Sequence, residues 1–157
     1  MKSFTGKVAA ITGAGSGMGR SLALALARER CHLALADRNE ATLAQTAQLA
    51  RAAALRTMGE VRITTRVLDV AERAAMFDWA ADTAAQHQHV NLVFNNAGVA
   101  LSSTVEGMEY ADLEWIVGIN FWGVVHGTKA FLPYLKAVGE GHMSTPRACS
   151  GCSRNRA

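Results

Sequence analysis

Three glycines near the start of the chain are spaced so that the backbone around them could bind a phosphate. Gly13, Gly17 and Gly19 lie between the apolar run Val8–Ile11 and the Ala- and Leu-rich segment Arg20–Arg28. The first segment predicts a buried strand and the second predicts a helix. A strand, a glycine turn and a helix in this order direct free N–H groups and the positive end of a helix dipole at one point, which favours an anion. An ordinary tight turn is the alternative.

The spacing of these glycines distinguishes between phosphate loops. The pattern G-x-G-x-x-G fails because its last position, counted from Gly13, falls on Met18, and the P-loop pattern fails because Ala14–Ser21 lacks its first Gly and its Lys. The pattern T-G-x-x-x-G-x-G fits from Thr12 onward. It resembles the cofactor loop of the short-chain dehydrogenase/reductase family, and the resemblance covers residues 6 to about 142. It implies that a nicotinamide dinucleotide contacts the loop at Gly13, Ser16, Gly17, Met18 and Gly19.

An acidic residue follows the second predicted strand, His32–Ala36. A carboxylate at Asp37 can accept hydrogen bonds from both hydroxyls of an adenosine ribose, and its charge repels a 2′-phosphate. Arg38 favours the opposite preference, because a guanidinium can pair with that phosphate, whereas Ser16 adds no charge. We therefore expect NAD in preference to NADP. Asp37 could also cap the helix that begins near Glu40, and the two roles are compatible.

Two more segments follow predicted strands and match the family. Asp69 and Val70 close the third strand, Val61–Leu68; the resemblance implies that Asp69 borders the adenine pocket, and capping of the next helix is the alternative. The segment Asn95–Gly98 follows the fourth strand, Asn91–Phe94. The resemblance implies that this segment steadies the sheet and lines the adenosine-ribose side of the cleft, through Asn96, Ala97 and Gly98.

Catalytic residues of the family are matched only in part. Asn120, within Gly118–Gly123, matches the asparagine whose backbone carbonyl holds a water in the proton relay, and an Asn tolerated inside a helix is the alternative. The family also uses a Ser, and a Tyr and a Lys in Tyr-x-x-x-Lys, where the Lys lowers the pKa of the Tyr acid/base. Neither tyrosine matches, because Tyr110 is followed four positions on by Glu and Tyr134 by Val.

The order of elements that must position these residues predicts the fold. Strands alternate with helices, which implies an α/β fold with a Rossmann-like, doubly wound parallel sheet and ligands at the carboxyl ends of the strands. One helix carries an apolar stripe at Leu43, Ala47, Ala50 and Ala54, and the next carries one at Phe77, Ala80, Ala81 and Ala84. A long helix runs from about Tyr110 to Leu132, where Pro133 ends it. We expect the fold to be truncated after this helix, with the fourth strand at an open edge.

The last residues read differently from the rest. Residues 1–142 are expected to form an incomplete dinucleotide-binding domain, and residues 143–157 an aberrant, disordered tail without periodicity. Back-translated and shifted by one base, the codons from Met143 can encode a strand followed by Ser-Ser, so we interpret the tail as frameshifted. Its single C-x-x-C, Cys149–Cys152, is weak support for metal binding, and no metal is expected. Cys31 is expected to be buried rather than a nucleophile.

Bulk properties limit the partners. Half of the residues are hydrophobic, yet no apolar stretch is long enough to span a membrane and no signal peptide is seen, so we expect a cytoplasmic protein without membrane association. The net charge of +3 comes from Arg147, Arg154 and Arg156; without them 13 basic residues face 13 acidic ones, which argues against nucleic-acid binding.

The resemblance implies an NAD(P)-dependent oxidoreductase that transfers a hydride between a secondary alcohol and a ketone or aldehyde. A full-length relative would take a small-molecule substrate and form a homo-oligomer. The chain itself lacks the Ser, Tyr and Lys, so we expect it to be inactive. The alternative function is a catalytically dead dinucleotide-binding fragment, or a non-functional gene product.

Overall fold

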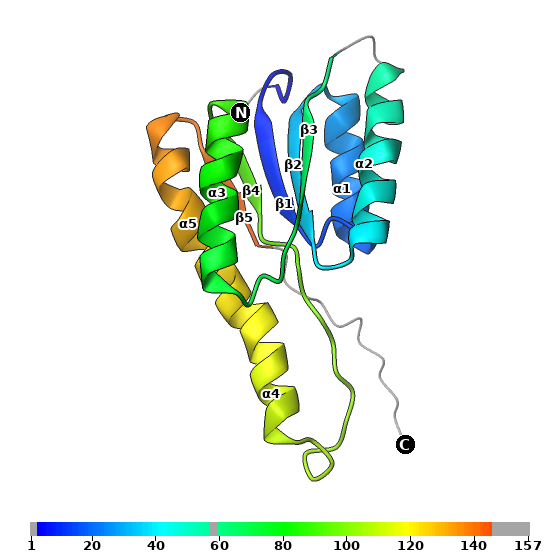
Figure 1. The fold of residues 1–157 in the computed structure, drawn as a ribbon, viewed down its shortest axis with the longest axis vertical. Helices are drawn as coiled ribbons and strands as arrows, with labels where there is room; N and C mark the ends of the chain where they lie inside the picture. Colours follow the sequence, from blue (N-terminus) through cyan, green and yellow to red (C-terminus); the bar gives the residue numbers. More distant parts are fainter. Residues whose placement is uncertain (1–2, 57–59, 146–157) are drawn as a thin grey trace.

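Five parallel strands form a single sheet with helices on both faces (Figure 1). A computed structural model describes residues 3–56 and 60–145. The strand order is β3-β2-β1-β4-β5. In chain order the elements are β1 (Val8–Thr12), α1 (Gly17–Arg28), β2 (His32–Asp37), α2 (Glu40–Leu55), β3 (Ile63–Val67), α3 (Arg73–His87), β4 (Leu92–Phe94), α4 (Tyr110–Val117), the π-helical turn η1 (Gly118–Trp122), α5 (Gly123–Ala137) and β5 (His142–Ser144).

The sheet reverses its direction of growth at β1. The chain first adds β2 and β3 on one side of β1, and then crosses to add β4 and β5 on the other side. The carboxyl ends of β1 and β4 therefore lie next to each other, with Ile11 paired to Phe94. Folds of this kind bind ligands at this reversal point. The predicted α/β fold with a Rossmann-like parallel sheet is confirmed.

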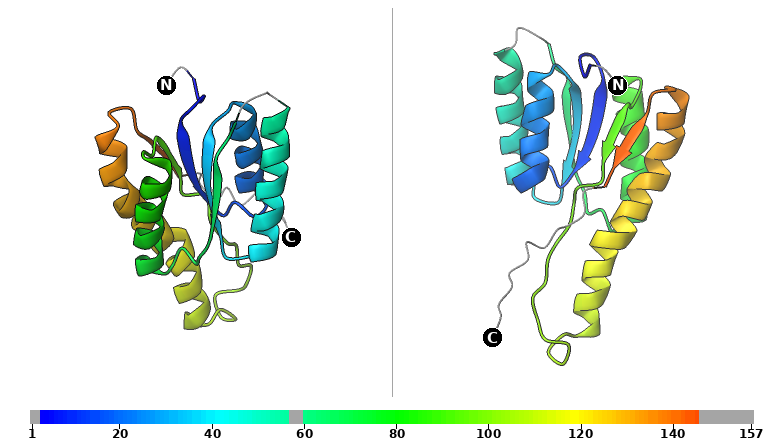
Figure 2. Two further views of the ribbon diagram at one scale, coloured as in Figure 1. Left: turned by 45° about the horizontal axis from the view of Figure 1, so that its top comes forward. Right: turned by 180° about the vertical axis from the view of Figure 1, so that it is seen from behind.

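Each face of the sheet is covered by its own pair of helices. Helices α1 and α2 pack on one face, and α3 and α5 pack on the other (Figures 1 and 2). The predicted stripe of α2 is confirmed, because Leu43, Ala47, Ala50 and Ala54 are all buried. The predicted stripe of α3 is wrong in part. Its buried face carries Met76, Trp79 and Ala80, whereas Phe77 and Ala81 are exposed.

A fifth strand extends the sheet beyond its predicted edge. Leu92 pairs with His142 and Phe94 with Ser144, and Met143 packs into the core between them. The fourth strand is therefore not at an open edge, and β5 continues past residue 142 to Ser144. The backbone explains this difference, because β5 satisfies hydrogen-bonding groups that β4 would otherwise leave free. Residues 146–157, with most of the predicted tail, lie outside the described residues.

The long helix after β4 also differs from its prediction. It begins at Tyr110 as expected, but it continues through Pro133 to Ala137. Pro133 lies on an exposed face, where water can bond the carbonyl that loses its N–H partner. No helix within residues 3–56 and 60–145 has the length and apolarity needed to cross a membrane.

Candidate functional site

The loop between β1 and α1 exposes an uncapped helix terminus. Its backbone turns at Gly13 and Gly17, whose φ angles of +64° and +50° favour glycine. The N-cap residue of α1, Ser16, makes no side-chain capping bond, and the first helical turn contains no acidic residue. The N–H groups of this first turn have no partner within the helix. The helix N-terminus therefore keeps its donors and its positive partial charge for a ligand.

Gly19 supports this loop from behind. A Cβ atom at Gly19 would lie 2.1 Å from the carbonyl oxygen of Gly13 and 2.7 Å from the side-chain nitrogen of Asn96. The residue is buried, and it is not among the residues that line the cavity described below. Its contribution is the close approach of α1 to the loop.

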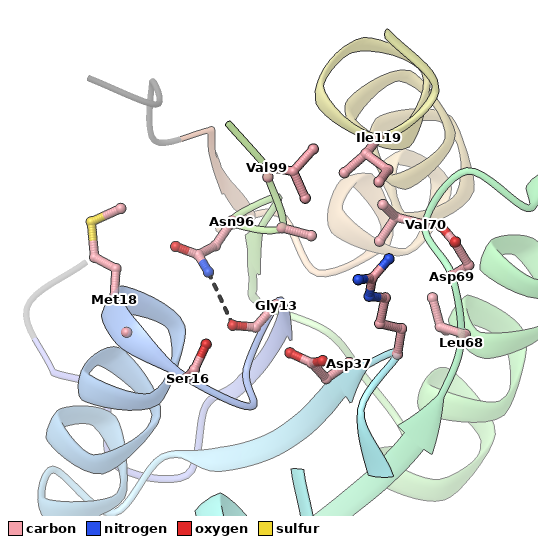
Figure 3. A pocket seen from close by; sticks show the side chains of 14 residues that line it. Gly13, Ser16, Met18, Asp37, Leu68, Asp69, Val70, Asn96, Val99 and Ile119 are labelled. Atoms are coloured by element: carbon pink, nitrogen blue, oxygen red, sulfur yellow. Dashed lines mark hydrogen bonds between the residues drawn. The ribbon is translucent and has the colours of Figure 1, made fainter. Parts of the chain in front are cut away.

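The end of β4 is bonded to the glycine loop. The hydroxyl of Thr12 accepts hydrogen bonds from the N–H groups of Asn96 and Ala97, at 3.0 and 3.1 Å. In return the side-chain amide of Asn96 donates to the carbonyl oxygen of Thr12 at 3.1 Å and to that of Gly13 at 3.3 Å. Figure 3 shows the bond to Gly13. The segment thus fixes the two adjacent strand ends relative to each other.

Asp37 faces the same loop from the end of β2. One carboxylate oxygen accepts a hydrogen bond from the N–H of Gly15 at 2.8 Å, and the other accepts from the N–H of Asn39 at 2.9 Å. The alternative role of Asp37 as a helix cap is wrong, because Asn39 caps α2 by accepting from the N–H of Thr42. Arg38 is exposed beside Asp37.

Asp69 lies across the cleft, at the end of β3. Its carboxylate accepts a hydrogen bond from the N–H of Ala71 at 2.9 Å. It does not cap the following helix, since α3 begins at Arg73 with Glu72 as its N-cap residue. The capping alternative is therefore wrong for Asp69 as well, and its side chain shapes the turn that leads into α3.

These segments enclose a cavity of about 380 Å³ (Figure 3). Every residue predicted to bind the cofactor lines it, except Gly19. Three further lining residues, all apolar, were not predicted: Leu68 and Val99 adjoin predicted cofactor-binding residues, and Ile119 adjoins Asn120. The lining consists of Gly13, Ser16, Gly17, Met18, Asp37, Arg38, Leu68, Asp69, Val70, Asn96, Ala97, Gly98, Val99 and Ile119.

The arrangement offers three kinds of contact within one cavity. The α1 terminus at Gly17 offers donors to an anion, and Asp37 offers acceptors to hydroxyl groups. On the other side, Leu68, Val70 and Ile119 offer apolar surface to a flat ring. Figure 3 shows Ser16, at the α1 terminus, on one side of the cavity and Leu68, Val70 and Ile119 on the other.

Asn120 is held at the edge of this site. Its side-chain oxygen accepts from the N–H of Val99 at 2.9 Å, and its side-chain nitrogen donates to the carbonyl oxygen of Val99 at 2.8 Å. It lies in η1, where the N–H of Gly123 bonds the carbonyl oxygen of Gly118, five residues back. Single π-helical turns of this kind are frequent at functional sites. The side chain of Asn120 thus ties the long helix to the strand-β4 loop.

Comparison with known proteins decides the family. Residues 7–144 match the family model described as short chain dehydrogenase. The chain belongs to the short-chain dehydrogenase/reductase family. The resemblance noted from the glycine loop and from Asn95–Gly98 is therefore confirmed.

Relatives of this short-chain dehydrogenase/reductase chain are about twice its length. It is 48% identical over 143 residues to "Putative oxidoreductase SadH" of Mycobacterium tuberculosis, which covers 91% of this chain and 50% of the relative. It is 32% identical over 150 residues to human estradiol 17-beta-dehydrogenase 11, which covers 96% of this chain and 48% of that protein. The chain spans about half the length of the relatives it matches.

A solved structure has the same fold as this family member. The structure of a short-chain dehydrogenase/reductase from Burkholderia phymatum in complex with NAD superposes with a TM-score of 0.84 at 36% identity. The match covers 92% of this chain and 50% of that one. The sheet and helices described above are thus those of a short-chain dehydrogenase/reductase.

Cys31 and His126 lie outside the cavity, and burial shifts the pKa of each side chain. Cys31 is buried, as predicted. Burial raises the pKa of its thiol to about 12. Burial, with a smaller effect of Arg73, lowers the pKa of His126, whose ring stacks on Trp122 with 5.9 Å between ring centroids. Cys31 belongs to the core, whereas His126 lines a second cavity together with Arg73 and Trp122.

Proposed function

We propose that this chain binds a nicotinamide dinucleotide in the cavity between the carboxyl ends of β1, β2, β3 and β4. The observation that carries the proposal is the joint placement of an uncapped helix N-terminus at Gly17 and the fixed carboxylate of Asp37 on one cavity. The helix N-terminus would bind an anion, and the carboxylate would bind hydroxyl groups. Adenosine diphosphate joins both kinds of ligand group, because its diphosphate is attached to a ribose. The similarity to a protein solved with NAD supports the same ligand.

The residues present fit such a ligand along its length. The backbone at Gly17 and Met18 would hold the pyrophosphate, and Asp37 would accept from the ribose hydroxyls. Leu68 and Val70 would pack on the adenine, with Asp69 accepting from its amino group. The segment from Asn96 to Gly98 would border the adenosine-ribose side of the ligand. When bound, the nicotinamide ring supplies hydride transfer, while this chain supplies binding and orientation.

The charges near the ribose favour NAD over NADP. The carboxylate of Asp37 is held by two backbone N–H groups, so it cannot turn away from a 2′-phosphate without losing these bonds. Arg38 is the nearby cation that lines the cavity and is exposed to water, which weakens its attraction for a phosphate. The net preference is therefore for a ribose without the phosphate.

The reaction of the family would be hydride transfer between a secondary alcohol and a ketone or aldehyde. For the 157 residues alone we propose binding without turnover, because no Tyr-x-x-x-Lys occurs among them. Asn120 would remain, with its side chain bonded to Val99. Loss of both the acid/base and the cation that lowers its pKa removes several orders of magnitude in rate.

The test is a fluorescence titration of the purified chain with NADH, followed by assays of NADH oxidation with mixed ketones. We expect saturable binding without oxidation. The D37A variant should bind at least about tenfold more weakly, since a charged hydrogen-bond acceptor is lost. The matched control is D78A, at an exposed position on α3. Absence of NADH binding by the folded chain contradicts the proposed ligand, and turnover contradicts the proposed inactivity.

A further inference from the structure

Arg20 connects the glycine loop to helix α2. It is the fourth residue of α1, and its side chain is half-buried. Its guanidinium donates to the carbonyl oxygen of Gly15, to the hydroxyl of Thr46 at 2.9 Å and to the side-chain oxygen of Gln45 at 3.0 Å. Acceptors on the glycine loop and on α2 therefore hold the planar guanidinium in one orientation.

Gly15 is held through both of its backbone polar groups. Its carbonyl oxygen accepts from Arg20 and lies 3.3 Å from the hydroxyl of Thr46, which is fully buried. Its N–H donates to the carboxylate of Asp37. The carbonyl and the N–H belong to neighbouring peptide planes that share the Cα atom of Gly15, so a bond that holds the carbonyl limits how far this Cα, and the N–H attached through it, can move from Asp37.

The space around Gly15 leaves no freedom for this arrangement to shift. A Cβ atom there would lie 2.5 Å from the hydroxyl of Thr42 and 2.8 Å from the carboxylate of Asp37. Gly15 itself is buried. The loop therefore packs directly against Asp37, and a displaced Gly15 would displace the carboxylate or break its hydrogen bond.

The charge of Arg20 is not paired directly with Asp37. The ion pairs found within residues 3–56 and 60–145 are Lys7–Glu140 and Arg66–Asp82. The cation instead bonds carbonyl and hydroxyl oxygens, and Gly15 connects it to Asp37. Its Nε and Nη2 donors bond these oxygens, and Arg20 does not line the cavity.

We propose that Arg20 is a positioning residue that sets the preference of the site for an unphosphorylated ribose. By holding Gly15 in place through its carbonyl oxygen, it keeps the Gly15 N–H within reach of Asp37 and the carboxylate facing the cavity. This inference rests on the proposed dinucleotide function. It assigns the discrimination between NAD and NADP to a residue that does not line the cavity.

The test compares R20M with R20K and with R28M. R20M keeps the apolar stem and removes the donors, and R20K keeps the charge without the planar fork. The control residue, Arg28, is exposed in the last turn of the same helix. For each variant, dissociation constants for NADH and NADPH are measured by fluorescence, and exchange of the Gly15 amide hydrogen is measured by NMR in the free chain.

We expect R20M to weaken NADH binding about tenfold while NADPH binding changes little, because the lost hydrogen bonds orient only the group that discriminates. R20K should show a smaller loss, and R28M none. Equal weakening of both dinucleotides would overturn the inference, since it would assign Arg20 a purely structural role.

The amide exchange separates this inference from the proposed function. Exchange of the Gly15 amide should be faster in R20M, or in R20K if R20M does not fold, than in R28M. Unchanged exchange would contradict the positioning role even if NADH binds. If the unsubstituted chain binds neither dinucleotide, the proposed function is wrong and the inference about specificity fails with it, whereas the exchange measurement still decides whether Arg20 holds the loop.

Discussion

The side-chain nitrogen of Asn96 lies 3.3 Å from the carbonyl oxygen of Gly13 and joins the end of β4 to the glycine loop after β1. The same nitrogen also bonds the carbonyl oxygen of Thr12. The two strands are neighbours in the sheet, but their residues are more than eighty positions apart in sequence. One amide group thereby holds the two walls of the proposed cofactor site in register.

Substitution of Asn96 by Asp should therefore weaken both the fold and the site. N96D keeps the shape of the side chain but replaces the donor with a carboxylate that faces two carbonyl oxygens. We expect a loss of about 1–3 kcal/mol in the free energy of unfolding, since two bonds are lost and a charge is poorly matched. Denaturant titration measures this loss, and NADH titration should show weaker binding.

The control for this substitution is N39D. Asn39 uses its side-chain oxygen to cap α2, and Asp caps helices equally well, so N39D should change stability little. Equal stability of N96D and N39D would show that the donor of Asn96 is dispensable.

Gly19 should tolerate no side chain. In G19A the new methyl group would meet the carbonyl oxygen of Gly13 at 2.1 Å, so the loop must move. We expect a loss of about 2–4 kcal/mol in stability from this overpacking. G118A is the matched control, because its methyl group would meet Ala71 at an ordinary 3.6 Å and its φ of −54° suits alanine. The two thermal unfolding midpoints give the comparison, and a G19A midpoint as high as that of G118A would contradict the contact.

The sequence predicted the parts of the fold that depend on local patterns. Short apolar runs located β1, β2 and β4, and the stripe at Leu43 and Ala47 located the buried face of α2. The fifth strand was missed because three residues, His142–Ser144, carry no periodicity of their own. The buried face of α3 was assigned to Phe77 because alanine, which is abundant there, does not distinguish one side of a helix from the other.

The candidate site was predictable where its residues follow strand ends. Asp37, Asp69 and Asn96 could be placed at one edge, since parallel strands end on the same side. Side-chain pairing across the site could not be predicted. The bonds between Asn120 and Val99 join residues 21 positions apart and depend on how the helix packs. No short motif encodes such a contact.

The charge of Asp37 should control the choice of dinucleotide. D37N keeps an oxygen that can accept from the N–H of Gly15, but it removes the charge that repels a 2′-phosphate. We expect the ratio of the dissociation constants for NADPH and NADH to fall at least about tenfold, which corresponds to about 1.4 kcal/mol. Parallel titrations of the two dinucleotides measure this ratio. The control is D78N, at an exposed position on α3. An unchanged ratio would remove Asp37 from the specificity argument.

A buried histidine should make the stability of the chain depend on pH. His87 lies at the end of α3, and its ring nitrogen Nε2 lies 3.0 Å from the hydroxyl of Thr64 on β3. Its other ring nitrogen is buried without a hydrogen-bond partner among the residues the structure describes. Burial, with smaller effects of the charges of Arg62, His32 and His89, lowers the pKa of His87 to about 4.

This depressed pKa fixes the sign of the effect. An unfolded histidine has a pKa of about 6.5, so between that value and about 4 the unfolded chain binds more protons than the folded chain at this site. The contribution of neutral His87 is complete above pH 6.5 and decreases as the pH falls, by at most about 1.4 kcal/mol per pH unit.

H87Q, which cannot be protonated, should show a shallower loss of stability over this range. Urea titrations at several pH values measure the slope, and H142Q, at an exposed position in β5, should keep the slope of the unsubstituted chain. Identical slopes for H87Q and H142Q would mean that His87 is not the buried group that responds to acid.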